Sequence, residues 1–325
     1  MKTAGDGNTN KTAQGPGFGI LVHAMKESAS SKPRMTALER KALFGAVATQ
    51  LITGSTYLFA KLALNEFGPL ALGCLRFSIT AVVFTLLLGW RKILTLPRPG
   101  DRRLFLALAA LAVPLNQALF LTGQKYAPSS HGALMYAMTP LMVLFLSGIF
   151  LGERITWPKL AGVALGLSGV ATVLFDRTAA VSGETLFGDT LLFLAVVTWA
   201  VFTILSKKAL TRYTPLELTG TALTLGAVLF LPVGGFALAV QDWTTVTPTG
   251  IGSVLYLSLL TSVVAYLVWA WALRILEAGK VAVVSNLQPV IAVILGWLFL
   301  GEPVTAHFIA GTGLVISGVF LTQRG

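Results

Sequence analysis

Charged residues are scarce in this chain of 325 residues. Only 11% of positions are Asp, Glu, Lys or Arg, whereas ordinary soluble domains carry about 25%. Hydrophobic residues make up 55% of the chain, and the mean hydropathy is +0.78. This composition excludes a soluble globular domain. The net charge of +11 does not indicate a nucleic-acid partner, because the basic residues cluster between apolar runs and form no face with interleaved aromatics.

Cysteine and recognisable catalytic motifs are equally rare. Cys74 is the single cysteine, so no disulfide can form within the chain. The sequence has no P-loop, no His-Glu-x-x-His, no cysteine pair and no nucleophile-elbow motif. The three histidines, His23, His131 and His307, are too scattered to suggest a metal site. We therefore expect no enzyme activity, no cofactor and no bound metal.

Acidic residues are missing from the middle of the apolar runs. All 13 carboxylates fall in the N-terminal segment, between runs or near their ends. Proton-coupled exporters of cationic drugs generally need a buried acid that binds either a proton or the cation. The distribution of acids therefore disfavours that mechanism.

What the chain does have is apolar runs of about 20 residues, the length that crosses a bilayer. We count ten, with boundaries uncertain by about two to four residues. They are 43–62, 69–89, 103–122, 129–150, 158–175, 187–206, 215–236, 249–272, 280–300 and 304–322. The sequence predicts an all-α polytopic membrane protein with ten transmembrane helices.

The runs belong to two related halves. Residues 129–173 and 278–322 align without a gap at an offset of 149 positions, and a weaker match at offset 146 joins Lys61-Leu-Ala-Leu to Lys207-Lys-Ala-Leu. Five spans per half is an odd number, so the second half must lie inverted relative to the first. We predict one repeat at 41–176 and another at 185–322. Inverted repeats around a shared interface are typical of alternating-access carriers.

The distribution of basic residues sets the orientation. With the N-terminus in the cytoplasm, 20 of the 24 Lys and Arg residues fall in cytoplasmic segments and three on the outer side. Both termini are then cytoplasmic. Residues 1–40 lack the apolar core of a signal peptide and are expected to form a disordered cytoplasmic tail. Met1 and Met35 both fit a start site.

Three basic residues lie inside or at the outer ends of spans. Arg76 is seven residues into the second span, where an arginine is costly and should face the bundle interior or a wet cavity. It either attracts a substrate carboxylate or ties helix carbonyls together. Lys61 and Lys125 end the first and third spans; they either attract an anion or snorkel to the interface.

Polar and aromatic residues in mid-span complete the predicted substrate site. Amides in hydrocarbon need partners, so they should point inward, either lining a cavity or bonding between helices. Hydroxyl residues such as Thr53, Thr56 and Ser285 accompany them. With Lys61 and Arg76, the predicted substrate-binding residues are Tyr57, Asn116, Gln117, Tyr136, Trp199, Tyr266, Trp269, Asn286 and Gln288.

Two prolines and two glycines occupy equivalent positions in the halves. Pro140 and Pro289 each remove a backbone hydrogen bond in mid-span, which predicts a hinge or gate. Gly152 and Gly301 suit helix C-termini, and we expect each glycine and the acid that follows it to have a structural role at the end of the helix.

These features resemble the EamA family of the drug/metabolite transporter superfamily. The marks are Lys61-Leu-Ala-Leu, Leu70…Arg76-Phe77 and the two Pro…Leu-Gly-Glu blocks that begin at Pro140 and Pro289. The resemblance covers residues 41–322. It implies an inner-membrane carrier whose central cavity is lined by spans one, three, four, six, eight and nine.

The sequence as a whole predicts an inner-membrane secondary transporter that exports small metabolites, such as amino acids or related carboxylates, by alternating access. The partners are a small-molecule substrate and the lipid bilayer, and the protein is either a monomer or a homodimer. A broad-specificity drug exporter and a membrane component that binds a ligand without moving it are the alternatives. The substrate, the direction of transport and the energy coupling stay open.

Overall fold

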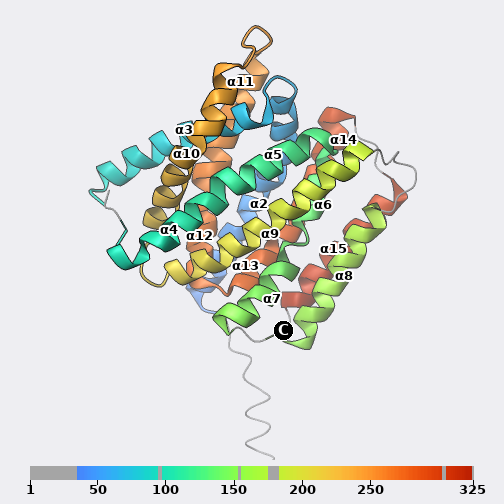
Figure 1. Cartoon of the computed structure of the whole chain (residues 1–325). Helices are drawn as coiled ribbons and strands as arrows, with labels where there is room; N and C mark the ends of the chain where they lie inside the picture. Colours follow the sequence, from blue (N-terminus) through green and yellow to red (C-terminus); the bar gives the residue numbers. More distant parts are fainter. Residues whose placement is uncertain (1–34, 94–96, 153–154, 175–182, 302–304, 324–325) are drawn as a thin grey trace, which may run out of the picture.

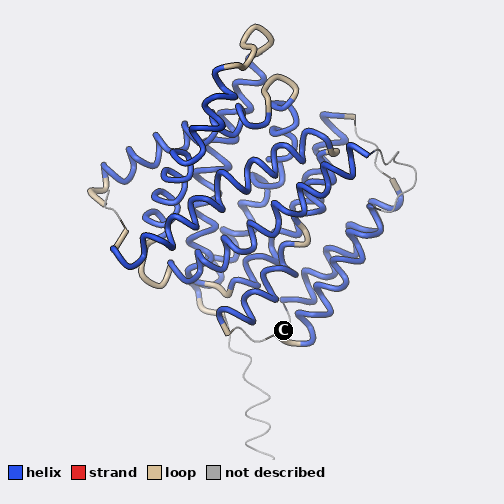
Figure 2. The backbone as a smooth tube through the Cα atoms, in the orientation of Figure 1, coloured by secondary structure: helices blue, strands red, loops and turns tan. Residues whose placement is uncertain are grey.

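The computed structural model describes residues 35–93, 97–152, 155–174, 183–301 and 305–323, and every regular element within these ranges is a helix (Figure 2). The predicted all-helical class is therefore confirmed. The first helix begins at Ala37, earlier than the apolar run at residue 43, because Thr36 and Glu39 form a reciprocal capping box. The expected tail up to residue 34 lies outside the described residues.

The first half contains five helical segments, some of them divided. They are α2 (Ala37–Leu64), α3 (Pro69–Trp90), η1 (Pro99–Asp101) with α4 (Arg102–Ala110), η2 (Leu111–Leu115) and α5 (Asn116–Tyr126), then α6 (Ser129–Tyr136) with α7 (Thr139–Leu151), and α8 (Trp157–Leu174).

The second half repeats this order. Its segments are α9 (Gly183–Ala209), α10 (Pro215–Ala239), α11 (Pro248–Leu255) with η3 (Tyr256–Ala265) and α12 (Tyr266–Ile275), then α13 (Ala278–Val284) with η4 (Ser285–Leu287) and α14 (Gln288–Leu300), and α15 (Ala306–Gln323). Among the described residues, eight of the ten segments are long and apolar enough to cross a membrane. The other two, α8 and α15, have 18 residues each, about 27 Å of helix.

The helices pack in pairs related by the repeat. α8 packs along α15 at one edge of the bundle and α3 along α10 at another, so equivalent helices meet (Figure 1). The contact of α5 with α9 has its counterpart in the contact of α12 with α2, and α6 with α14 mirrors α13 with α7. Large buried side chains such as Phe77, Phe84 and Phe202 fill the interior between these pairs.

Irregular backbone also recurs at equivalent places. The third and eighth segments each contain π-helical backbone, η2 and η3. The fourth and ninth segments are interrupted directly before Pro140 and Pro289, which then occupy the first turn of α7 and α14. Irregular backbone at membrane depth is tolerated where it lines a cavity or is buried in protein.

Glycines permit the turns and close contacts that the repeat requires. Gly152 and Gly301 end α7 and α14 with a φ of 67° each, a left-handed conformation that glycine adopts without strain. The predicted helix ends are thus confirmed. Gly318 of α15 packs so closely on α8 that an added Cβ would clash with the carbonyl oxygen of Gly162.

Two opposite faces of the bundle each carry a lysine that joins two helical segments. The Lys61 face carries residues 65–68, 127–128 and 240–247, and the Lys207 face carries residues 210–214 and 276–277. At each face the named lysine reaches from one segment to the C-terminal end of another. The two faces are equivalent by the repeat, since Lys61 and Lys207 correspond at offset 146.

Candidate functional site

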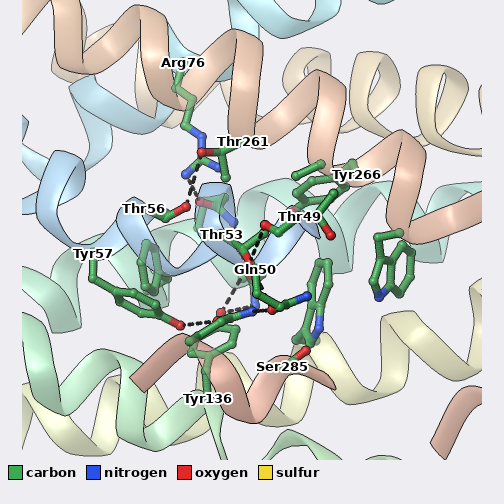
Figure 3. Close-up of a pocket in the computed structure, with 17 residues that line it drawn as sticks. Thr49, Gln50, Thr53, Thr56, Tyr57, Arg76, Tyr136, Thr261, Tyr266 and Ser285 are labelled. Atoms are coloured by element: carbon green, nitrogen blue, oxygen red, sulfur yellow. Dashed lines mark hydrogen bonds between the residues drawn. The ribbon is translucent and has the colours of Figure 1, made fainter. Parts of the chain in front are cut away.

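A cavity with an empty volume of about 720 Å³ lies in the centre of the bundle (Figure 3). Its walls come from both halves. The lining residues are Thr49, Gln50, Thr53, Thr56, Tyr57, Arg76, Asn116, Gln117, Phe120, Tyr136, Trp199, Thr261, Ala265, Tyr266, Trp269, Ser285 and Gln288.

The two halves contribute equivalent positions with different chemistry. At offset 149, Asn116, Gln117 and Phe120 of α5 correspond to Ala265, Tyr266 and Trp269 of η3 and α12. All six line the cavity. The first half supplies amides where the second supplies a methyl group and an aromatic ring. At these equivalent positions the lining is therefore richer in amides on the side of the first half and in aromatic rings on the side of the second.

Arg76 brings a positive charge to the polar side. Its side chain is 2% exposed and comes from α3. The Nε group donates to Ser262 Oγ at 2.9 Å, and Nη1 donates to Gln117 Oε1 at 3.1 Å. None of the ion pairs among the described residues involves Arg76, and none of the described residues bonds to Nη2. The guanidinium is thus fixed at two nitrogens and lies over the Phe77 ring at 5.0 Å, while the third nitrogen has no hydrogen-bond partner among the described residues.

A chain of amides extends from Arg76 across the polar wall. Gln117 Nε2 donates to Asn116 Oδ1 at 2.8 Å. Asn116 Nδ2 in turn donates to the Ala195 carbonyl at 2.7 Å and lies 3.2 Å from the Tyr136 hydroxyl. The amides therefore do both things that the sequence left open: they line the cavity and they bond between helices.

A second polar group joins α2 to the broken ninth segment. Tyr57 donates its hydroxyl hydrogen to Gln288 Oε1 at 2.8 Å, and Gln288 Nε2 donates to Gln50 Oε1 at 3.0 Å. Gln50 Nε2 donates to the Ala46 carbonyl at 2.7 Å. Figure 3 shows this group below α2, with Tyr57 and Gln50 converging on it. The bonds tie the start of α14 to the first helix beside the cavity.

The aromatic wall is one connected cluster. The ring of Trp199 lies 5.1 Å from that of Trp269 and 5.4 Å from that of Tyr266, measured between centroids. Trp269 also stacks on Phe202 at 5.6 Å. Offset and edge-to-face ring contacts of this kind fix the side chains in place and present an apolar surface.

Nine of the eleven predicted binding residues line this cavity. The two exceptions are Lys61, whose ammonium donates to the backbone carbonyls of Ala127 at 2.9 Å and Gln124 at 3.1 Å, and Asn286, whose side chain lies outside the described part of the structure. The sequence did not single out five other lining residues: Thr49, Gln50, Phe120, Thr261 and Ala265. Gln50 carried the same signal as the other amides, an uncharged polar group in mid-run.

Charged pairs lie away from the cavity and join the two halves. His131 Nδ1 is 3.1 Å from Asp189 Oδ1 on the Lys61 face. On the Lys207 face, Arg212 Nη1 donates to Asp101 Oδ1 at 2.7 Å, and Lys159 Nζ donates to Glu277 Oε2 at 3.1 Å. Both faces are therefore held by bonds between the halves. In the described ranges, no group of three or more His, Cys, Asp or Glu side chains is placed to hold a metal.

Glu277 has a pKa shifted by these neighbours. Its partial burial raises the pKa, but the hydrogen bond and positive charge of Lys159, with the charge of Lys280 at 3.7 Å, lower it by more. The pKa of Glu277 therefore lies below its ordinary value of 4.5.

Comparison with known proteins identifies the family. The model of the EamA-like transporter family matches residues 40–175 and 186–324, once for each half. The chain belongs to the EamA-like transporter family. It is a multi-pass membrane transporter, and its environment is a lipid bilayer.

Individual relatives of this EamA-like transporter align with it over almost their full lengths. An "uncharacterized transporter" of Archaeoglobus fulgidus is 33% identical over 279 residues, 84% of this chain and 94% of the relative. A protein of Streptantibioticus cattleyicolor named "probable terminal-alkyne amino-acid exporter" is 27% identical over 289 residues, 87% of this chain and 94% of its own. One solved crystal structure superimposes with a TM-score of 0.71 at 17% identity, over 87% of this chain and 98% of that one. At that identity the superposition speaks for the fold alone.

Proposed function

We propose that this EamA-like transporter is an inner-membrane secondary carrier that exports small amphipathic metabolites, such as amino acids or related carboxylates. The two five-helix halves rock around the central cavity, which opens to one face at a time. Both termini lie in the cytoplasm, the Lys61 face points outward and the Lys207 face inward.

The observation that carries this proposal is the two-sided cavity. The polar wall suits the charged end of a carboxylate, because Arg76 Nη2 bonds to none of the described residues and guanidinium groups bind carboxylates with short, directional hydrogen bonds. The wall of Trp199, Tyr266 and Trp269 suits an apolar side chain.

The repeat and the charge distribution support the rest. Inverted repeats that meet at a central site are the usual architecture of alternating-access carriers. The excess of Lys and Arg in the segments of the Lys207 face supports a cytoplasmic position for that face. The name of the Streptantibioticus relative supports export of amino-acid-like compounds.

The test is net flux. Cells that express the chain and cells that express an Arg76→Gln variant are grown side by side, and small metabolites in the medium are profiled over time. We expect one or a few amphipathic metabolites to accumulate outside only with the unchanged protein. Purified protein in proteoliposomes then separates a carrier from a protein that only binds: binding of such a metabolite without net flux would refute the proposal. Robust resistance of expressing cells to lipophilic cations would favour drug export instead.

A further inference from the structure

The charges and hydrogen bonds of the cavity narrow the substrate class further. We infer that the preferred ligand is a monoanion: a single carboxylate on an apolar body, without a charged amino group. This inference rests on the proposed function and concerns the same cavity. It separates acids and N-blocked amino acids from free amino acids, two groups that the proposed function leaves together.

The first step is the charge of the lining. Arg76 is the one charged side chain among the described residues that line the cavity. A buried charge without a counter-charge is costly in a medium of low dielectric constant, and a ligand with one negative charge offsets that cost. A zwitterion brings a positive charge as well, and the described lining offers it no carboxylate.

The second step is the balance of donors and acceptors. The Nη2 group of Arg76 offers N–H donors that no described residue uses, and a carboxylate can only accept. An ammonium group can only donate; it would have to share amide oxygens that already accept a hydrogen bond from the protein, and no carboxylate among the described lining residues balances its charge. Gln117 Oε1 accepts from Arg76, Gln288 Oε1 from Tyr57, and Gln50 Oε1 from both Gln288 and Thr53.

The third step is the opposing wall. Trp199, Tyr266 and Trp269 present ring faces and edges to the cavity. These rings bind an apolar group at no electrostatic cost. They could also attract an ammonium through cation–π contact. That contact would favour a free amino acid, so the experiment must separate the two classes of ligand.

The experiment uses three probes with one side chain: N-acetylphenylalanine, an anion; phenylalanine, a zwitterion; and phenylalaninamide, a cation. Binding to the full-length purified protein is measured by thermal shift and by tryptophan fluorescence, and flux is measured in proteoliposomes against protein-free vesicles. We expect the anion to bind about tenfold or more tightly than the zwitterion, and the cation weakest of all.

Arg76→Gln should abolish this order of affinities: we expect the affinity for the anion to fall about tenfold and the affinities for the zwitterion and the cation to change less. Arg76→Lys should recover part of the preference, because it restores the charge but not the planar fork. The matched control is Arg274→Gln, which removes an exposed arginine that does not line the cavity. If Arg76→Gln does not fold, Ser262→Ala is the second test: it removes the bond that positions the guanidinium beside the cavity, so we expect a weaker preference for the anion and unchanged affinity for phenylalaninamide.

Binding or flux of phenylalanine equal to or better than that of N-acetylphenylalanine would overturn the inference and leave the carrier function standing. So would an anion preference that survives Arg76→Gln. Absence of flux for every compound in the metabolite profile would instead refute the carrier function. Absence of binding for all three probes, in a protein that transports other metabolites, would overturn the inference alone.

Discussion

Two basic residues from neighbouring spans have different surroundings. Arg76 lines the cavity and has one nitrogen that no described residue bonds to, whereas Lys61 binds the carbonyl groups at the end of α5. Lys207 makes the equivalent contacts with the Leu273 and Leu276 carbonyls at the end of α12. Because cations near helix C-termini stabilise the free carbonyls, this repeated geometry favours a structural role for Lys61.

We therefore expect Lys61→Met to lower the stability of the protein by about 1–3 kcal/mol, the cost of leaving buried acceptors without a donor. The relative affinities for anionic and zwitterionic ligands should not change. Thermal unfolding in detergent and ligand titration measure the two effects. Lys125→Met is the control, because Lys125 is an exposed lysine nearby on the same face. Unchanged stability with lost binding would place Lys61 in the substrate path after all.

Glu277 gives a prediction about pH. Its lowered pKa means that the folded protein holds the carboxylate in its charged form more strongly than the unfolded chain does. The resulting stabilisation is present above the ordinary pKa of 4.5 and is lost as the pH falls through the lower, folded value. Glu277→Gln should thus cost up to about 1 kcal/mol near neutral pH, since the pair is partly exposed. The difference in Tm from the unchanged protein should shrink as the pH falls below 4.5. A difference that grows on acidification would contradict this.

At the scale of elements, the broken helices are the feature that the repeat makes most informative. The fourth and ninth segments both stop before a proline, and the residues at these breaks, Tyr136, Ser285 and Gln288, line the cavity. A proline has no N–H to donate, so the preceding turn is left with a free carbonyl and bends at low cost. A hinge at both places remains a prediction.

Pro140→Ala and Pro289→Ala test it. Alanine restores the N–H donor and favours a continuous helix, so both variants should fold and bind ligand but exchange between open states more slowly. We expect initial flux in proteoliposomes to fall several-fold, with little change in affinity. Pro232→Ala is the control, because Pro232 lies inside the continuous helix α10 and does not line the cavity. Equal flux in all three variants would exclude a hinge role for the pair.

The sequence predicted these elements better than the contacts between them. The Pro…Leu-Gly-Glu blocks located the spans, the breaks and the Gly152 and Gly301 ends, because local chemistry determines each of these. The sequence could not predict where the Lys61 ammonium lies, because its carbonyl partners belong to a helix more than sixty residues away. Gln50 was missed for a related reason. A mid-span amide needs hydrogen-bond partners whether it lines a cavity or faces a neighbouring helix, and only the packing of the helices determines which of the two it does.

For the whole molecule, the ties between the halves limit how the transporter can move. Bonds between first and second halves hold both faces, with His131 and Asp189 on the Lys61 face and Lys159 and Glu277 on the Lys207 face. If the halves rock around the cavity, the ties on one face must separate when that face opens. The bond between α6 and α9 through His131 and Asp189 is therefore expected to break in the state that opens to the outside.

Cross-linking these two positions tests the motion directly. In a Cys74→Ala background, which removes the single native cysteine, His131→Cys and Asp189→Cys are joined by a short bifunctional methanethiosulfonate reagent. We expect transport to stop on cross-linking and to return when a reductant cleaves the bridge, because the halves can no longer part on that face. Thr214→Cys with Glu217→Cys is the matched control: both residues belong to the start of α10, so a bridge there joins no two halves. Full transport by a completely cross-linked His131→Cys/Asp189→Cys protein would show that the Lys61 face opens without separating α6 from α9, and the gate would have to lie elsewhere between the halves.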